Sequence, residues 1–143
     1  MTDCASTALR TPGWFRRLAC ATYDALLVTA VVLLATLPVA ALAGDVSQDW
    51  RKYLLQAYIL AVIGAYFVVS WSRNGQTLAL RTWRMRIVRT DGEPMGAATA
   101  FRRYLLALLG LALFGAGFLW SLVDRDRQFL HDRLTGTRLT DLR

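Results

Sequence analysis

The sequence LACATYDALLVTAVVLLATLPVAALA occupies residues 18–43 and is almost wholly apolar. It contains 26 residues, and Asp24 is the only charged side chain among them. A helix needs about 20 predominantly apolar residues to cross the hydrocarbon core of a bilayer. The segment therefore predicts a first transmembrane helix that is long enough to cross with some tilt.

Two further apolar segments follow. Residues 53–71 are 19 residues without a charge, and residues 104–123 are 20 more, interrupted by Gly110, Gly115 and Gly117. Aromatic residues at the ends of the second segment, Trp71 among them, are typical of a membrane interface. We predict an all-α membrane protein with two transmembrane helices and a third apolar segment. A flexible tail, 1–12, would precede a single membrane domain, 13–143.

The bulk composition also favours a membrane protein. The chain has 143 residues, of which 55% are hydrophobic, and combines a mean hydropathy of +0.35 with a net charge of +7. Soluble domains rarely combine these properties, whereas lipid-facing helices joined by basic loops do so readily. A pI near 10.2 also fits nucleic-acid binding. The basic residues, however, flank the apolar segments and no recognition motif is present, so we expect no nucleic-acid partner.

Metal-dependent and enzymatic functions find little support. Cys4 and Cys20 lack the spacing of metal ligands, and His131 is the only histidine, whereas a metal site needs several ligands together. His131 and Asp132 would suit a general base and its orienting carboxylate, but no nucleophile motif accompanies them. We expect no metal, no cofactor and no enzymatic activity. Asp132 is instead expected to join an arginine and pin the C-terminal tail, or to cap a helix.

The distribution of basic residues predicts the topology, because positive charge marks the cytoplasmic side. If all three apolar segments span, the two sides hold ten and seven basic residues. If the third segment enters and leaves on one side, the split becomes fifteen against two. The length of that segment, roughly 30 Å as a helix, favours spanning, whereas charge favours a re-entrant hairpin. We expect both termini to be cytoplasmic.

Residues 83–89 largely alternate between apolar and basic side chains, which is the period of a strand. Asp91-Gly92 then signals a turn, and residues 136–140 suggest a second short strand. A small cytoplasmic cap is therefore expected from residues 73–95 and 130–142. An amphipathic interfacial helix over 83–89 is the competing interpretation, because basic and aromatic residues also suit that position.

Asp24 is the residue with the clearest functional signal. A carboxylate within a membrane helix is costly and marks a functional site by default. Arg17 lies nearly two turns earlier on the same face, too far along the helix for direct contact. We therefore expect Asp24 to find a partner on another segment, with Arg102, Arg103 or a basic residue of the C-terminal tail as the candidates.

Five motifs in chain order complete the sequence analysis. They are Arg17-Leu18-Ala19 with Tyr23-Asp24, Gly75-Gln76-Thr77-Leu78, Arg86-Ile87-Val88 with Asp91-Gly92, Phe101-Arg102-Arg103, and Leu130-His131-Asp132-Arg133-Leu134 with Gly136-Thr137. Together they resemble the RDD family of bacterial membrane proteins, which is named for one arginine and two aspartates. The resemblance extends from residue 13 onward. It departs at Ala79-Leu80, where the family often has Gly-Lys, so no role of that lysine is carried over.

The resemblance implies an integral protein of the bacterial cytoplasmic membrane with a set of polar family residues. These are Arg17, Asp24, Gln76, Thr77, Arg102, Arg103, His131 and Asp132. Some members are linked to cation/proton exchange, so one hypothesis is that Arg17 and Asp24 line a proton or cation route. The other is a non-catalytic scaffold or assembly factor whose charges serve packing. Besides the lipid bilayer, we expect a homo-oligomer or a membrane-protein partner, because one chain has few helices to enclose a pathway.

Overall fold

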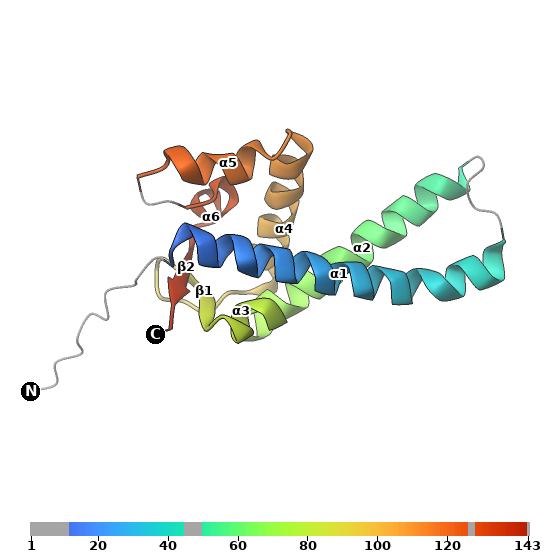
Figure 1. Cartoon of the computed structure of the whole chain (residues 1–143), viewed down its shortest axis with the longest axis horizontal. Coiled ribbons are helices and arrows are strands. Elements are labelled where there is room, and N and C mark those ends of the chain that lie inside the picture. The colour runs from blue at the N-terminus through green and yellow to red at the C-terminus, as the bar shows by residue number, and fades with distance from the viewer. Residues whose placement is uncertain (1–11, 45–49, 126–127, 143) are drawn as a thin grey trace, which may run out of the picture.

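A computed structural model describes residues 12–44, 50–125 and 128–142 of the chain. The predicted tail, 1–12, lies outside these residues except for Pro12. The elements in order are α1 (Trp14–Ala43), α2 (Arg51–Asn74), α3 (Leu78–Thr82), β1 (Met85–Arg89), α4 (Ala97–Ala112), α5 (Ala116–Val123), α6 (Leu130–Leu134) and β2 (Thr137–Asp141). Figure 1 shows the short elements gathered around the start of α1 and the end of α2. We call this part the head, and the remainder of α1 and α2 the arm.

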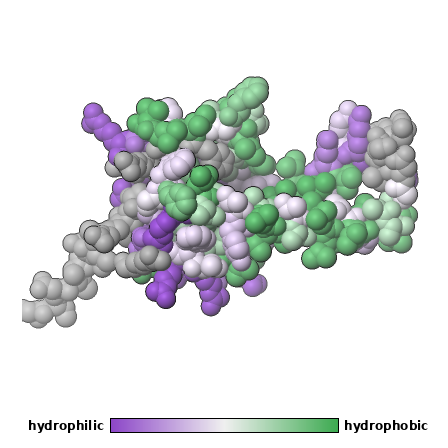
Figure 2. All heavy atoms as spheres, in the orientation of Figure 1, coloured by the Kyte–Doolittle hydropathy of each residue, from purple (hydrophilic) through white to green (hydrophobic). Residues whose placement is uncertain are grey.

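The arm confirms the two long apolar helices predicted from the sequence. α1 has 30 residues and α2 has 24, so both are long and apolar enough to cross a membrane. Each helix has an apolar window of 18 residues. None of that window is buried within the protein in α1, and 11% of it is buried in α2. Leu34 and Leu42 are 69% and 88% exposed, and Figure 2 shows a hydrophobic surface along the arm. A core helix of a soluble protein would bury such residues, so this exposure favours lipid as the surroundings.

The two predicted strands form the only sheet in the described part of the chain. β1 pairs antiparallel with β2, with Ile87 opposite Leu139. Both of these side chains are buried, which is the outcome expected when alternate residues of a strand face a core. The strand interpretation of residues 83–89 is therefore confirmed, and the interfacial-helix alternative is wrong.

The third apolar segment is a helical hairpin rather than one continuous helix. α4 ends at Ala112, and the chain turns through Phe114 and Gly115, with φ of 56° and 75°, before α5 begins. Glycine adopts such positive φ values without strain. A Cβ on Gly110 would lie 3.1 Å from the Cα of Gly117, so both glycines allow α4 and α5 to approach closely. Neither helix reaches the roughly 20 residues needed to span, and entry of the hairpin into a bilayer stays a prediction.

The hydrophobic core lies in the head, where both long helices meet the sheet. Buried residues from α1, α2, α3, β1, the loop before α4, α4 itself and β2 contribute to it: Cys20, Trp71, Ala79, Leu80, Met85, Ile87, Met95, Ala100, Tyr104 and Leu139. Arg16 closes the edge of this core by pairing with Asp141 and donating to the carbonyl of Trp83. The start of α1 is thereby fixed to the last strand of the chain.

Gly75 ends α2 and sets the direction of the chain toward β1. Its φ is 64°, and an added Cβ would lie 2.5 Å from the backbone oxygen of Ile87. We predict that Gly75→Ala lowers the free energy of unfolding by more than the roughly 1–2 kcal/mol that a left-handed conformation costs alone. Thermal unfolding in detergent would measure the loss. Gly96→Ala, where an added Cβ meets open space, is the matched control, and equal melting temperatures of the two variants would contradict the prediction.

Candidate functional site

Asp24 lies on α1 and receives hydrogen bonds from two hydroxyl groups. The Oγ1 of Thr77 donates to its Oδ2 at 2.9 Å, and the hydroxyl of Tyr66 donates to its Oδ1 over a longer 3.5 Å. Thr77 is the N-cap of α3, where its Oγ1 also accepts from the backbone N–H of Leu80 at 3.2 Å. Because that oxygen is already an acceptor at the helix end, its single proton is available for Asp24.

A second carboxylate, Asp132, forms a buried ion pair with Arg103. The distance from Nη2 of Arg103 to Oδ1 of Asp132 is 2.5 Å, and the two side chains are 5% and 1% exposed. The guanidinium of Arg103 also lies 4.6 Å from the ring centre of Trp71, which adds a cation–π attraction. Breaking a buried pair of this kind costs several kcal/mol because one charge is left uncompensated. The pair therefore holds α6 against α4.

Arg17 is buried at the start of α1, with its guanidinium 5.6 Å from the ring centre of Phe129. Phe129 in turn stacks on His131, with ring centres 5.4 Å apart and an interplanar angle of 10°. The imidazole Nε2 lies 3.6 Å from Oδ1 of Asp132. These contacts bring the first and last thirds of the chain together, so that Arg17 and Asp132 belong to one assembly in the head.

A cavity of about 400 Å³ lies between α1, α2, α4 and the C-terminal segment, and several of these polar groups line it. Arg17, Asp24, Arg103 and His131 line it. The rest of the wall is mainly apolar, with Ile63, Phe67, Tyr104, Leu108 and Leu111 among its residues. Because the two arginines and two aspartates of the assembly have equal and opposite formal charge, a neutral imidazole leaves the assembly balanced.

His131 is the group in the head with the clearest titration behaviour. Burial, together with the positive charge of Arg103, lowers the pKa of His131 from 6.5 to about 4, although Asp132 opposes the change. The imidazole is therefore neutral at pH 7. It can then act as a packing surface for Phe129 without adding a third positive charge to the assembly.

The sequence analysis expected an arginine as the partner of Asp24, and the structure shows two hydroxyl groups instead. Arg103 pairs with Asp132 instead, and Arg102 is exposed on α4. Asp24 uses hydroxyl groups, and the reason is geometric: the N-terminus of α3 packs against α1 and delivers Thr77 to the carboxylate. Gln76 is a structural residue in this arrangement, since its Nε2 donates to the carbonyl of Met85 at 2.7 Å.

Three aromatic residues of the site were not identified from the sequence. Trp71 was assigned to an interfacial belt, yet it is 7% exposed and lies under Arg103. Tyr66 could have been noticed as a hydroxyl within an apolar segment, but no pattern in the sequence points it toward Asp24. Phe129 had no distinguishing signal. Within the described residues no group of three or more His, Cys, Asp and Glu side chains lies together to hold a metal ion.

Comparison with known proteins agrees with the motifs. The sequence profile of the RDD family matches residues 11–136, which is most of the chain. The chain belongs to the RDD family. An uncharacterized protein of Rickettsia prowazekii (strain Madrid E) is 30% identical to this RDD-family protein in an alignment of 94 residues that covers 62% of this chain. The chain spans about half, 53%, of that relative's length. No solved structure matches.

The double role of Thr77 gives a prediction for stability. Thr77→Val removes both the hydrogen bond to Asp24 and the cap of α3, so we expect the free energy of unfolding to fall by about 1–3 kcal/mol. Thr77→Ser keeps the hydroxyl and should retain most of that stability. Denaturation of both variants in the same detergent would measure the difference, and an equal loss in both would mean that the hydroxyl is not the stabilising group.

His131 predicts a pH dependence of stability in the acid range. Between about pH 6.5 and pH 4 the unfolded chain binds a proton at His131 and the folded chain does not, so the free energy of unfolding decreases as pH falls through this window. The full effect is roughly 3 kcal/mol. We expect His131→Gln to reduce the difference in melting temperature between pH 7 and pH 5. An undiminished difference in the variant would contradict this assignment.

Proposed function

We propose that this RDD-family protein is a multi-pass protein of the bacterial cytoplasmic membrane that exchanges a proton for a cation at Asp24. The observation that carries the proposal is that Asp24, which lines a largely apolar cavity, has two hydroxyl partners, Thr77 and Tyr66. Neutral hydroxyls orient the carboxylate but do not cancel its charge. A proton or a small cation would then relieve the cost of holding that charge away from water.

The charge balance of the assembly supports exchange rather than simple binding. Arg103 and Asp132 neutralise each other directly, which leaves Arg17 and Asp24 as the other opposite charges at the cavity. One proton or one monovalent cation on Asp24 changes the charge of the cavity by the same amount. The two therefore compete for one site, and competition for one carboxylate is the simplest basis for coupling the two fluxes.

The proposed topology has the head and both termini in the cytoplasm. Arg16 at the start of α1 pairs with Asp141 in β2, so these two ends of the described chain share one side. Arg51 and Lys52 lie at the opposite end of the arm, whereas the other twelve basic residues of the described part of the chain belong to the segments around the head. This distribution supports a cytoplasmic head. The hairpin of α4 and α5 would then enter and leave the membrane on the cytoplasmic side.

A complete pathway requires more helices than one chain supplies. We therefore include assembly into a homo-oligomer, or with another membrane protein, in the proposal. The exposed leucines of the arm, such as Leu33 and Leu37 at 61% each, would face lipid or a neighbouring copy. The proposal assigns no catalytic residue and no nucleic-acid partner. The alternative of a non-catalytic scaffold is supported by the buried ion pair of Arg103 and Asp132, which serves packing whether or not anything is transported.

The decisive experiment is ion flux in vesicles that contain the full chain. We predict that Asp24→Asn abolishes pH-driven Na⁺ or K⁺ flux, measured with a pH-sensitive dye inside proteoliposomes, because an amide cannot bind and release a proton in this range. Insertion and melting temperature should remain close to those of the unchanged protein. Asp91→Asn, which removes a carboxylate from an exposed turn, is the matched control and should leave the flux intact.

Two results would count against the proposal. Flux that persists in the Asp24→Asn variant would exclude Asp24 as the exchange site. Absence of flux in the unchanged protein, combined with low abundance of the variant and a specific crosslinked neighbour, would favour the scaffold function instead.

A further inference from the structure

We propose that a pocket beside α3, lined by Arg73, Arg81 and Arg86, binds a phosphate-bearing anion, with the headgroup of an anionic phospholipid as the ligand that fits it best. The pocket has a volume of about 480 Å³. Its three arginines come from the last turn of α2, from α3 and from β1. We call it the arginine pocket. It is separate from the cavity at Asp24, and the inference does not rest on the proposed transport.

Hydrogen bonds hold the segment after Arg73 against the strand that carries Arg86. Gly75 reverses the chain after α2, and its carbonyl accepts from the N–H of Ile87 at 2.8 Å. Gln76 adds a second link by donating to the carbonyl of Met85 at 2.7 Å. These bonds tie the residues next to Arg73 to the residues on either side of Arg86. The backbone segments that carry Arg73 and Arg86 are therefore held in place by the fold.

The charge of the arginine pocket is not balanced within the described part of the chain. Arg16, Arg89, Arg103 and Arg133 each pair with an aspartate. Arg73, Arg81 and Arg86, by contrast, have no carboxylate within ion-pair distance among residues 12–44, 50–125 and 128–142. Three like charges around one pocket repel one another unless an anion lies between them. Guanidinium groups suit a phosphate in particular, because they can donate two parallel hydrogen bonds to it.

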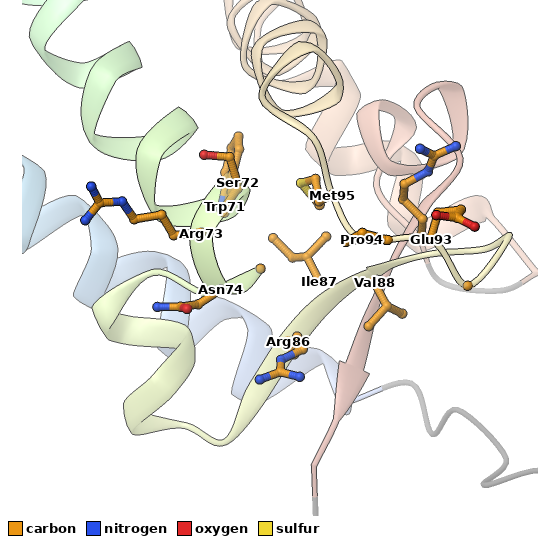
Figure 3. A pocket seen from close by; sticks show the side chains of 13 residues that line it. Trp71, Ser72, Arg73, Asn74, Arg86, Ile87, Val88, Glu93, Pro94 and Met95 are labelled. Carbon is orange, nitrogen blue, oxygen red and sulfur yellow. The ribbon is translucent and has the colours of Figure 1, made fainter.

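Neighbouring residues fit the rest of a lipid molecule. Figure 3 shows an adjoining pocket that shares Arg73, Asn74 and Arg86 with the arginine pocket. Asn74 lines the arginine pocket as well, so its amide can also contribute to binding a headgroup. Val69 and Leu78 line the same pocket and are 48% and 55% exposed. Val69 belongs to the apolar part of α2. A ligand with a phosphate at the arginines and an apolar chain along α2 would satisfy both kinds of surface, whereas free phosphate would satisfy only the first.

Selective retention of lipid by the full chain tests the inference. The protein is placed in bilayer nanodiscs of phosphatidylglycerol and phosphatidylcholine, extracted, and analysed by native mass spectrometry for the lipid that stays bound. An arginine near a lipid surface contributes about 1 kcal/mol, or roughly fivefold in binding. We expect the variant Arg73→Gln, Arg81→Gln, Arg86→Gln to lose at least that factor in preference for phosphatidylglycerol.

The matched control removes the same charge from elsewhere in the head. Arg84, Arg102 and Arg125 are exposed and do not line the arginine pocket, so their triple change to Gln should leave the preference within about twofold of the original. Circular dichroism checks that each variant is folded. If the first triple variant does not fold, Arg81→Gln alone, on the exposed surface of α3, replaces it, with an expected loss of roughly fivefold.

A second arm separates the two sources of phosphate. Binding of inorganic phosphate to the detergent-purified protein is measured by calorimetry, with the same two triple variants. Lipid retention that depends on the arginine pocket and resists millimolar phosphate identifies a headgroup site. Phosphate binding that depends on the pocket, without selective lipid retention, supports a site for a soluble phosphate compound. Equal behaviour of the two triple variants in both arms would overturn the inference, since it would reduce the effect to overall charge.

Discussion

The head depends on one constraint: each charge taken out of water must be stabilised by a contact inside the protein. Asp132 and Arg103 compensate each other directly, whereas buried Arg17 lies against Phe129 and Asp24 accepts from Thr77. Removing a charge from water costs several kcal/mol in real proteins, so these contacts can form only if the segments that carry them assemble together. The ion pair joins α6 to α4, and the hydrogen bond joins α3 to α1. The arrangement of the short elements follows from these two links together with the apolar core.

The same constraint fixes where the protein can meet the membrane. The 19 residues that follow Asp24 in α1 extend to Ala43, which is roughly 29 Å at about 1.5 Å per residue. This length is close to the hydrocarbon thickness of about 30 Å. With the arm in lipid, Asp24 therefore lies near the membrane boundary on the side of the head rather than at the centre of the membrane. Such a position explains how a carboxylate can have lipid-facing leucines on one side and the polar head on the other.

Local pattern was sufficient to predict the elements that depend on local chemistry. The segments at 18–43 and 53–71 were long and apolar enough to predict the two long helices. The alternation of side chains from 83 to 89 predicted β1, because one face of that strand is buried at Met85 and Ile87. The turn at 113–115 between α4 and α5 could not be predicted in the same way. Its glycines were visible, but a glycine allows a reversal without requiring one. What requires it is packing of Gly110 against Gly117, which is a property of the folded chain.

The side-chain contacts of the site residues could not be predicted from the sequence for a related reason. Asp24 and Thr77 are 53 positions apart, and hydroxyl residues are too common for one of them to stand out as the donor. Charge suggested an arginine partner for Asp24, because opposite charge is the strongest pairing rule that a sequence offers. The fold instead used Arg103 for Asp132, since α6 lies next to α4. The motif containing Gln76 and Thr77 did not predict the hydrogen bonds that these two side chains make.

The turn at residues 75–77 is shared by the two sites inferred from the structure. Thr77 donates to Asp24 and also lines the arginine pocket, while Gln76 and Gly75 hold β1 in place. An anion bound by Arg73 and Arg86 would stabilise this turn in its present conformation. The position of the Thr77 hydroxyl would then be fixed more firmly, and with it the orientation of the Asp24 carboxylate. A lipid headgroup at the arginine pocket would therefore act on the proposed exchange site through this turn, because Thr77 contacts both Asp24 and the pocket.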